Sequence, residues 1–302
     1  MKQITIEIID TIKDKIESLQ ELFIKKNPFI HYTDIRFDVS EDRGAFCENG
    51  DEKYCGMDYG LSCGVRVLAG KKCISPGYYG LTLGAESLNH LETTIEKCLD
   101  HAYQRALSNA EWKTKTKEQF PHLGKSLWNM ELAPIEIHRD TNPVQFERDP
   151  ASISPQQIST QIKDISQEIK SMGSTILYNH IGASTMLSRE FFSSSEGAAI
   201  DQTFAITYGI AYIVASGKEG VQEHYDYIGH QRGWEVIEQG CHGPYIYNKD
   251  LRSFSRELAQ ETVELSNAPA LPSTDGEVTV VTDPHYNALL AHEIIGHPNE
   301  LD

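Results

Sequence analysis

The chain has 302 residues, of which 39% are hydrophobic, and a formal net charge of −17. A chain of this length can bury a sizeable core and suggests roughly two domains. An acidic surface repels phosphate backbones, no apolar run approaches the ~20 residues that cross a bilayer, and the charged N-terminus is unlike a secretory signal. We therefore predict a cytoplasmic protein with no nucleic-acid or membrane partner.

The six cysteines form no C-x-x-C pair, and their spacings match no common zinc motif. They are Cys47, Cys55, Cys63, Cys73, Cys98 and Cys241. In a reducing compartment such residues are expected to be buried or incidental thiols.

Residues 1–110 have the pattern of an N-terminal α/β domain. Apolar residues recur at helical spacing over 9–22 and again over 88–107. Between these helices, residues 32–40 and 61–70 alternate apolar and polar side chains, as half-buried strands do. We therefore predict helices packed on a small sheet.

Residues 111–153 are polar and contain several prolines, which predicts a linker. Ser154 and Pro155 then have the pattern of an N-cap and a first helical residue. We expect a second, strand-rich domain over 154–302. Its first helix carries an apolar stripe that predicts burial in a core: Ile158, Ile162, Ile165 and Ile169.

Residues 174–238 contain β-branched and aromatic runs broken by Gly and Ser, which predicts an antiparallel meander. A helix near 253–266 and a short strand over 277–282 are expected to follow. Asp283 is a predicted N-cap, with Pro284 as the first residue of the last helix. The predicted fold class is α+β, with helices packed on the antiparallel sheet.

The last helix carries the sequence HEIIGH, in which one residue too many separates the histidines for the zinc-protease pattern H-E-x-x-H. Residues of an α-helix advance about 100° each, so His292 and His297 would lie ~140° apart rather than on one face. Gly296 can leave helical dihedrals, and Pro298 favours an extended conformation for His297. We therefore expect the helix to end or bulge at about Gly296 and to bring His297 back towards His292.

Metal-assisted hydrolysis is the chemistry that these residues predict. The two imidazoles would be zinc ligands. Glu293 would stand beside the metal as the general base that deprotonates a zinc-bound water. Because the pattern is short, the surrounding sequence has to support it.

The surrounding sequence resembles the TldD/PmbA family, also called modulators of DNA gyrase. The run VTVVTDPHYNALLAHEIIGHPNELD looks like the family's strand, Asp-Pro turn and metal helix. YTDIRF, GLSCGVRVLAGKKCISPGYYG and REFFSSSEGAAIDQTFAITYGIAYIVASG are similar to its N-terminal domain and serine-rich strand, so the resemblance covers essentially the whole chain. The TldD type carries a motif resembling HEAVGHxLEGD, which is matched by His292, Glu293, Gly296, His297, Glu300 and Asp302.

The resemblance implies a zinc-dependent metallopeptidase subunit that hydrolyses peptides or unfolded proteins, paired as a hetero- or homodimer with a TldD/PmbA-family subunit. It implies that His292 and His297 are metal ligands and that Glu293 is the base. In the family, the third ligand is a cysteine well downstream of the helix.

The sequence departs from the family after Asp302, where TldD-like chains continue. All six cysteines precede the motif, and Cys241 is a poor substitute ligand. Two histidines leave zinc one protein ligand short of the usual three, and Glu300 would either reach the metal or hold a histidine from behind. We therefore expect a strand-rich metallopeptidase domain that is incomplete at its C-terminus.

Two other functions remain open from the sequence. A non-catalytic subunit of a TldD/PmbA-like dimer is the alternative if the third metal ligand is missing. A DNA-binding modulator fits poorly with a net charge of −17. For His224 and His230, surface or packing roles are favoured over metal binding.

Overall fold

The computed structural model describes residues 4–122, 136–241, 249–273 and 275–300. The helices are α1 (Ile8–Lys26), α2 (Leu91–Gln119), α3 (Pro155–Lys170), α4 (Glu235–Gln239), α5 (Leu251–Leu265) and α6 (Pro284–Ala291). The strands are β1 (Ile30–Glu48), β2 (Asp51–Ala69), β3 (Ser75–Thr82), β4 (Arg139–Asn142), β5 (Ile176–Ser194), β6 (Ala199–Gly217) and β7 (Gly220–His230). Among the helices described, none is long and apolar enough to span a bilayer.

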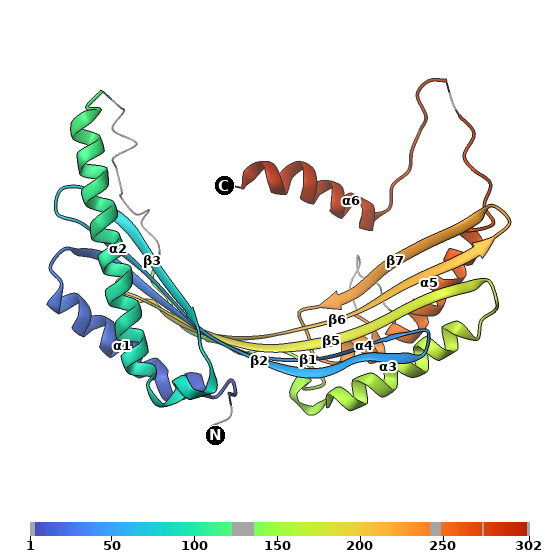
Figure 1. Cartoon of the computed structure of the whole chain (residues 1–302), viewed down its shortest axis with the longest axis horizontal. Helices are drawn as coiled ribbons and strands as arrows, with labels where there is room; N and C mark the ends of the chain where they lie inside the picture. Colours follow the sequence, from blue (N-terminus) through green and yellow to red (C-terminus); the bar gives the residue numbers. More distant parts are fainter. Residues whose placement is uncertain (1–3, 123–135, 242–248, 274, 301–302) are drawn as a thin grey trace.

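The strands form a seven-stranded sheet in the order β3-β2-β1-β5-β6-β4, with β7 also paired to β6. The pairs are antiparallel, apart from the parallel pairing of β4 with β6. Figure 1 shows the sheet bending into two arms, with α1 and α2 outside one arm and α3 outside the other. Side chains alternate between the helix-covered face and an open face, which carries Arg36, Phe46 and Tyr54.

Two hydrophobic cores lie on the helix-covered face of this one sheet. The first packs α1 and α2 against β1 and β2, with Ile12, Phe37 and Ile95 buried. The second packs α3 and α5 against β5 and β6, with Ile162 and Phe254 buried. Burial of these apolar stripes is the main stabilising term for each arm.

The range 111–153, predicted as a linker, contains regular secondary structure. Helix α2 continues to Gln119, and β4 also lies in this range. The last turns of α2 are mostly exposed, so no apolar period marked them as helix. Moreover, β1 of the predicted first domain pairs with β5 of the predicted second, from Asp34↔Ser194 to Glu48↔His180. The α+β class is confirmed, whereas the division into domains stays a prediction.

The predicted strands 32–40 and 61–70 are the outer parts of one long hairpin. β1 and β2 have 19 residues each and are joined by the turn Asn49-Gly50. Both turn residues have positive φ, 51° and 86°, which the type I′ form of a two-residue hairpin loop requires and which Asn-Gly tolerates best. The Asn-Gly pair in the sequence could have been used to predict this turn.

Other predicted elements have mixed outcomes. The Ser154 cap is confirmed, with a capping box to Gln157, and β5, β6 and β7 form the predicted antiparallel meander. The strand predicted over 277–282 is wrong for the described structure. Val278, Val280 and Val281 are exposed there, and a β-branched run becomes a strand only when another strand pairs with it.

The outer edge of β3 is covered by side chains of α2. Arg105 donates to the carbonyl oxygen of Tyr78, Asn109 to that of Pro76 and Lys113 to that of Ile74. These donors recur every fourth residue of the helix, and their acceptors recur every second residue along β3 and the residue just before it. The helix therefore satisfies carbonyls that would otherwise invite another strand.

Candidate metal centre

The helix that carries the motif begins as its sequence predicts. The Asp283 carboxylate accepts a hydrogen bond from the backbone N–H of Tyr286 at 2.8 Å, and Pro284 is the first helical residue. This cap satisfies one of the free N–H groups of the first turn. Regular α-helix then continues to Ala291.

A wide turn of π-helix follows α6 over His292–Gly296. The N–H of His297 donates to the carbonyl of His292, five residues earlier, so one extra residue is accommodated in the turn. The wider turn brings side chains five apart onto one face, which the regular helical angle of about 100° per residue cannot do. The predicted bulge is therefore confirmed, and it starts at His292.

The mechanism expected for this bulge needs correction. His297 keeps right-handed helical dihedrals (φ −56°, ψ −43°) rather than becoming extended, and Gly296 stays helical too. The chain continues in a 3-10 turn over His297–Asn299. Pro298 fits because it needs no N–H partner, and the widened turn already departs from the α-helical ladder. The histidines therefore meet within the helix rather than by a break in it.

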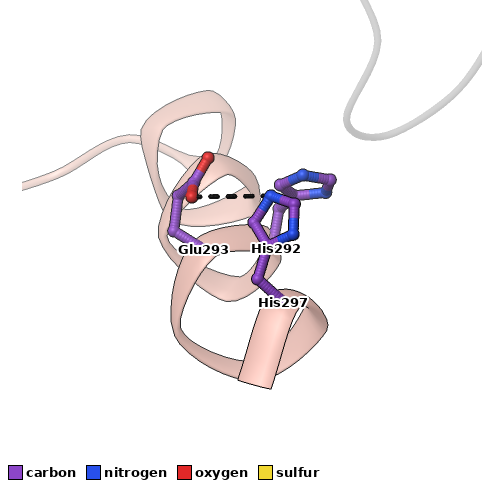
Figure 2. Close-up of side chains that lie close together, drawn as sticks. All are labelled: His292, Glu293 and His297. Carbon is purple, nitrogen blue, oxygen red and sulfur yellow. Dashed lines mark ion pairs between the residues drawn. The ribbon is translucent and has the colours of Figure 1, made fainter. Parts of the chain in front are cut away.

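Figure 2 shows His292, Glu293 and His297 gathered on one side of this turn. Their potential ligand atoms all lie within 4.8 Å of one another. The two imidazole rings are 4.7 Å apart between centroids and nearly perpendicular, at 83°. The Nε2 of His297 lies 3.7 Å from a carboxylate oxygen of Glu293. Two imidazole nitrogens and a carboxylate are a donor set that suits zinc.

Glu300 holds the opposite side of the His297 ring. Its carboxylate lies 3.1 Å from Nδ1 of His297. Of the two positions left open for Glu300, this is the one behind the His297 imidazole, where a carboxylate fixes the ring and leaves Nε2 free. Nε2 is the nitrogen that faces Glu293, so both acidic residues act on one imidazole from opposite sides.

The cluster is open to solvent in the described structure. The side chains of Glu293 and His297 are 55% and 50% exposed. Figure 1 shows α6 between the two arms of the sheet, with its first turn beside β7. His285 of that turn lies 3.8 Å from the carboxylate of Asp226 on β7. Sequence reasoning singled out neither His285 nor Asp226, because their approach depends on tertiary structure.

The other candidates from the sequence lie apart from this cluster. Cys241 is buried, and burial raises the pKa of its thiol. The Nδ1 of His224 lies 3.9 Å from a carboxylate oxygen of Glu261 on α5. The Nδ1 of His230 is buried and makes no hydrogen bond within the described part of the chain. Of the residues that the structure describes, His292, Glu293 and His297 are the one group of three with ligand atoms this close.

The sequence of the chain is similar in part to that of one named protein. No protein-family model matches the chain. A protein named "Metalloprotease" from Methanothermobacter thermautotrophicus is 29% identical over 117 residues, which is 39% of this chain and 23% of that protein.

Three solved structures share the architecture. A protein from Thermotoga maritima described as a modulator of a DNA gyrase has a TM-score of 0.60 and 12% identity over 86% of this chain. A protein of the same description from Bacteroides thetaiotaomicron has a TM-score of 0.53 and 13% identity over 84%. TldE from Thermococcus kodakarensis has a TM-score of 0.50 and 11% identity over 86%.

The chain spans 50%, 50% and 47% of the lengths of these three solved chains. The likeness at such low identity is one of fold. This chain has the fold of the DNA gyrase modulators and TldE, and the resemblance to the TldD/PmbA proteins stated from the sequence is confirmed at that level.

Proposed function

We propose that this chain is part of a TldD-type, zinc-dependent metallopeptidase that hydrolyses peptide bonds in peptides or unfolded proteins. The observation that carries the proposal is the π-helical turn that gathers two imidazoles and a carboxylate. The likeness to a protein named as a metalloprotease supports it, as does the shared fold.

Each residue of the cluster has a distinct task in this proposal. His292 and His297 would hold the metal, and Glu300 would fix the ring of His297 through Nδ1. Bound zinc would polarise the peptide carbonyl and lower the pKa of water. The Glu293 carboxylate would accept a proton from the attacking water and pass it to the departing amine.

The third ligand would come from elsewhere. Catalytic zinc usually has three protein ligands, and the gathered histidines are two. By the family resemblance, we propose a cysteine in a part of the protein that follows these residues. A TldD/PmbA-family subunit is the proposed dimer partner.

The decisive experiment compares Glu293→Gln with Glu277→Gln, an exposed glutamate outside the cluster, in the full-length protein. Glu293→Gln should retain bound zinc and lose peptidase activity by a factor of at least ~100, because general-base catalysis contributes about that much or more. Zinc is measured by elemental analysis and activity on an unfolded protein substrate. Full activity of Glu293→Gln would remove Glu293 from the role of base.

A second candidate function is a non-catalytic subunit of a TldD/PmbA-like dimer, because the described cluster offers two histidines where catalytic zinc usually has three protein ligands. Such a subunit would form a stable dimer at neutral pH without binding zinc. Equilibrium dialysis against zinc, followed by sedimentation of the same sample, separates the two functions.

A further inference from the structure

A second feature of the open face plays no part in the metal cluster. A cavity of about 280 Å³ lies where β2, β1, β5 and β6 run side by side. Aromatic rings form its walls and glycines form its floor: Phe46, Tyr54, His180 and Tyr208, with Gly44 and Gly182. We call this cavity the aromatic pocket.

Three of the rings form a stacked row across three strands. Tyr54 on β2 stacks with Phe46 on β1, with centroids 5.8 Å apart and planes 20° apart. Phe46 in turn stacks with His180 on β5, at 5.0 Å and 28°. Tyr54 and Tyr208 are 47% and 49% exposed, so their rings remain accessible to another ring.

The floor of the pocket depends on glycine. A Cβ atom at Gly182 would lie 3.1 Å from the Cγ2 of Ile210 and 3.4 Å from the Cβ of Phe46. A Cβ atom at Gly44 would lie 3.0 Å from the Cβ of Ser184. Glycine in a strand marks a place where another group approaches the backbone closely. Larger residues here would occupy the cavity or displace its walls.

Aromatic side chains continue from the pocket towards the free edge of the sheet. His180 pairs across the strands with Tyr212, and Tyr212 pairs with Tyr225 on β7. Tyr225 and Tyr227 are 66% and 57% exposed. Exposed rings on neighbouring strands are typical of a binding surface, where rigid aromatic side chains contribute most of the affinity.

The pocket and the motif helix lie near neighbouring strands of the sheet. Ile210 on β6 lines the pocket and pairs with Tyr227 on β7, and Asp226, the residue before Tyr227, lies 3.8 Å from His285 of α6. The rim is acidic: a Glu48 carboxylate oxygen lies 3.9 Å from Nδ1 of His180, and Glu223 accepts a hydrogen bond from the Tyr212 hydroxyl. An acidic rim on a chain with net charge −17 disfavours nucleotides and other anions.

We infer that the aromatic pocket binds one aromatic side chain of a peptide substrate. The inference rests on the proposed peptidase function and adds the side chain that the protein selects. The volume is slightly below the ~300 Å³ at which pockets for whole drug-sized ligands begin, which suits one ring better than a larger molecule. Stacked walls favour an aromatic over an aliphatic side chain.

The probe for this binding is N-acetyl-L-phenylalanine amide, which carries one ring, two amide groups and no charge. Its binding to the 302-residue chain is followed by NMR titration, with N-acetyl-L-alanine amide and phenylacetate as comparisons. The phenylalanine amide should bind at least ~10-fold more tightly than the alanine amide, because one aromatic contact contributes about that factor. Phenylacetate should bind more weakly because the rim is acidic.

A pair of variants separates the pocket from the rest of the open face. Tyr54 lies over Gly56, and Tyr78 lies over Gly64 and Gly80 in the same way, but on the other arm and outside the pocket. Tyr54→Ala should weaken binding of the phenylalanine amide roughly tenfold, and Tyr78→Ala should leave it unchanged. Gly182→Val should abolish binding by filling the floor, provided that its thermal unfolding shows a folded protein.

Equal binding of the phenylalanine and alanine amides, or equal loss in Tyr54→Ala and Tyr78→Ala, would overturn the inference. Tighter binding of adenosine than of the phenylalanine amide would assign the pocket to another class of ligand. None of these measurements needs bound metal. These measurements can therefore refute the binding of an aromatic side chain while the peptidase proposal stands. Conversely, loss of the peptidase proposal would leave the binding measurements unchanged.

Discussion

Arg189 and the pair His292 and His297 each gather carboxylates, but in opposite surroundings. Arg189 lies on β5 with a side chain that is 14% exposed, and it forms paired hydrogen bonds with both Asp10 on α1 and Asp201 on β6. The histidines lie on one exposed helical turn with Glu293 and Glu300. The Arg189 cluster connects α1, β5 and β6, whereas the histidine cluster lies within one segment, residues 292–300.

The difference between the two clusters indicates which ionisable side chains are available to bind a ligand. Lys13 also contacts both aspartates of the Arg189 cluster, at 3.0 and 3.1 Å, so each charge there already has a partner. In the histidine cluster, Nε2 of His297 lies 3.7 Å from Glu293, and the ion pairs described bring no Lys or Arg to Glu293 or Glu300. The first arrangement supports the fold, and the second is suited to bind a ligand.

The largest expected effect on stability is that of Arg189→Leu. Removing the guanidinium leaves the nearly buried Asp201 carboxylate with Lys13 alone, which should lower the free energy of unfolding by about 3 kcal/mol. The matched control is Arg36→Leu, because the Arg36 side chain is 61% exposed and pairs only with Glu190 among the ion pairs described. It should cost less than about 1 kcal/mol. Urea unfolding of both variants tests the comparison, and equal losses would refute it.

His297→Ala should weaken metal binding and leave the stability of the fold almost unchanged. Zinc affinity should fall at least ~100-fold, about 2.7 kcal/mol, because the site loses one of its ligands. Stability without metal should change by less than about 0.5 kcal/mol, since the side chain is exposed. Competition with a chromogenic chelator measures the affinity. His224→Ala is the control, and weakening by both variants alike would contradict the assignment.

Glu300→Gln should weaken zinc binding by about tenfold, or roughly 1.4 kcal/mol. The amide can still accept a hydrogen bond from Nδ1–H of His297, but without the negative charge that raises the basicity of Nε2. The same chelator competition applies. Complete loss of zinc would instead indicate that Glu300 is itself a ligand.

The smallest effect concerns pH. Arg189 holds the pKa of Asp10 and that of Asp201 below their ordinary range in the folded protein. A depressed folded-state pKa contributes stability above the unfolded value of about 3.9, and this contribution is lost as the pH falls through the folded value. The stability advantage of the wild type over Arg189→Leu should therefore shrink between about pH 5 and pH 2. A constant difference over that range would argue against the ion pairs as its source.

Local signals in the sequence predicted local structure well. Ser154 and Asp283 were recognised as caps because a side chain only has to reach an N–H three residues away. The stripe that includes Ile158 and Ile169 was recognised as core from its spacing alone. The residues of the candidate metal centre were found in the same way, because all of them lie within one short segment. Their roles stay predictions.

Contacts between distant segments could not be found in this way. Nothing local in β1 indicates that it pairs with β5, so the sequence did not predict that β1 and β5 belong to one sheet. The strand predicted at 277–282 failed for the same reason, because β-branched residues favour a strand only where a partner exists.

By itself, the sequence determined the identity and order of the chemical groups: two histidines and a glutamate on one helix, and apolar stripes for two cores. The tertiary structure decided where these groups meet. The π-helical turn brings His292 and His297 to one side of the helix, and the register of four strands assembles Phe46, Tyr54, His180 and Tyr208 around one cavity. Strand register depends on pairing between residues far apart in the chain, and that pairing is settled only when the whole sheet forms.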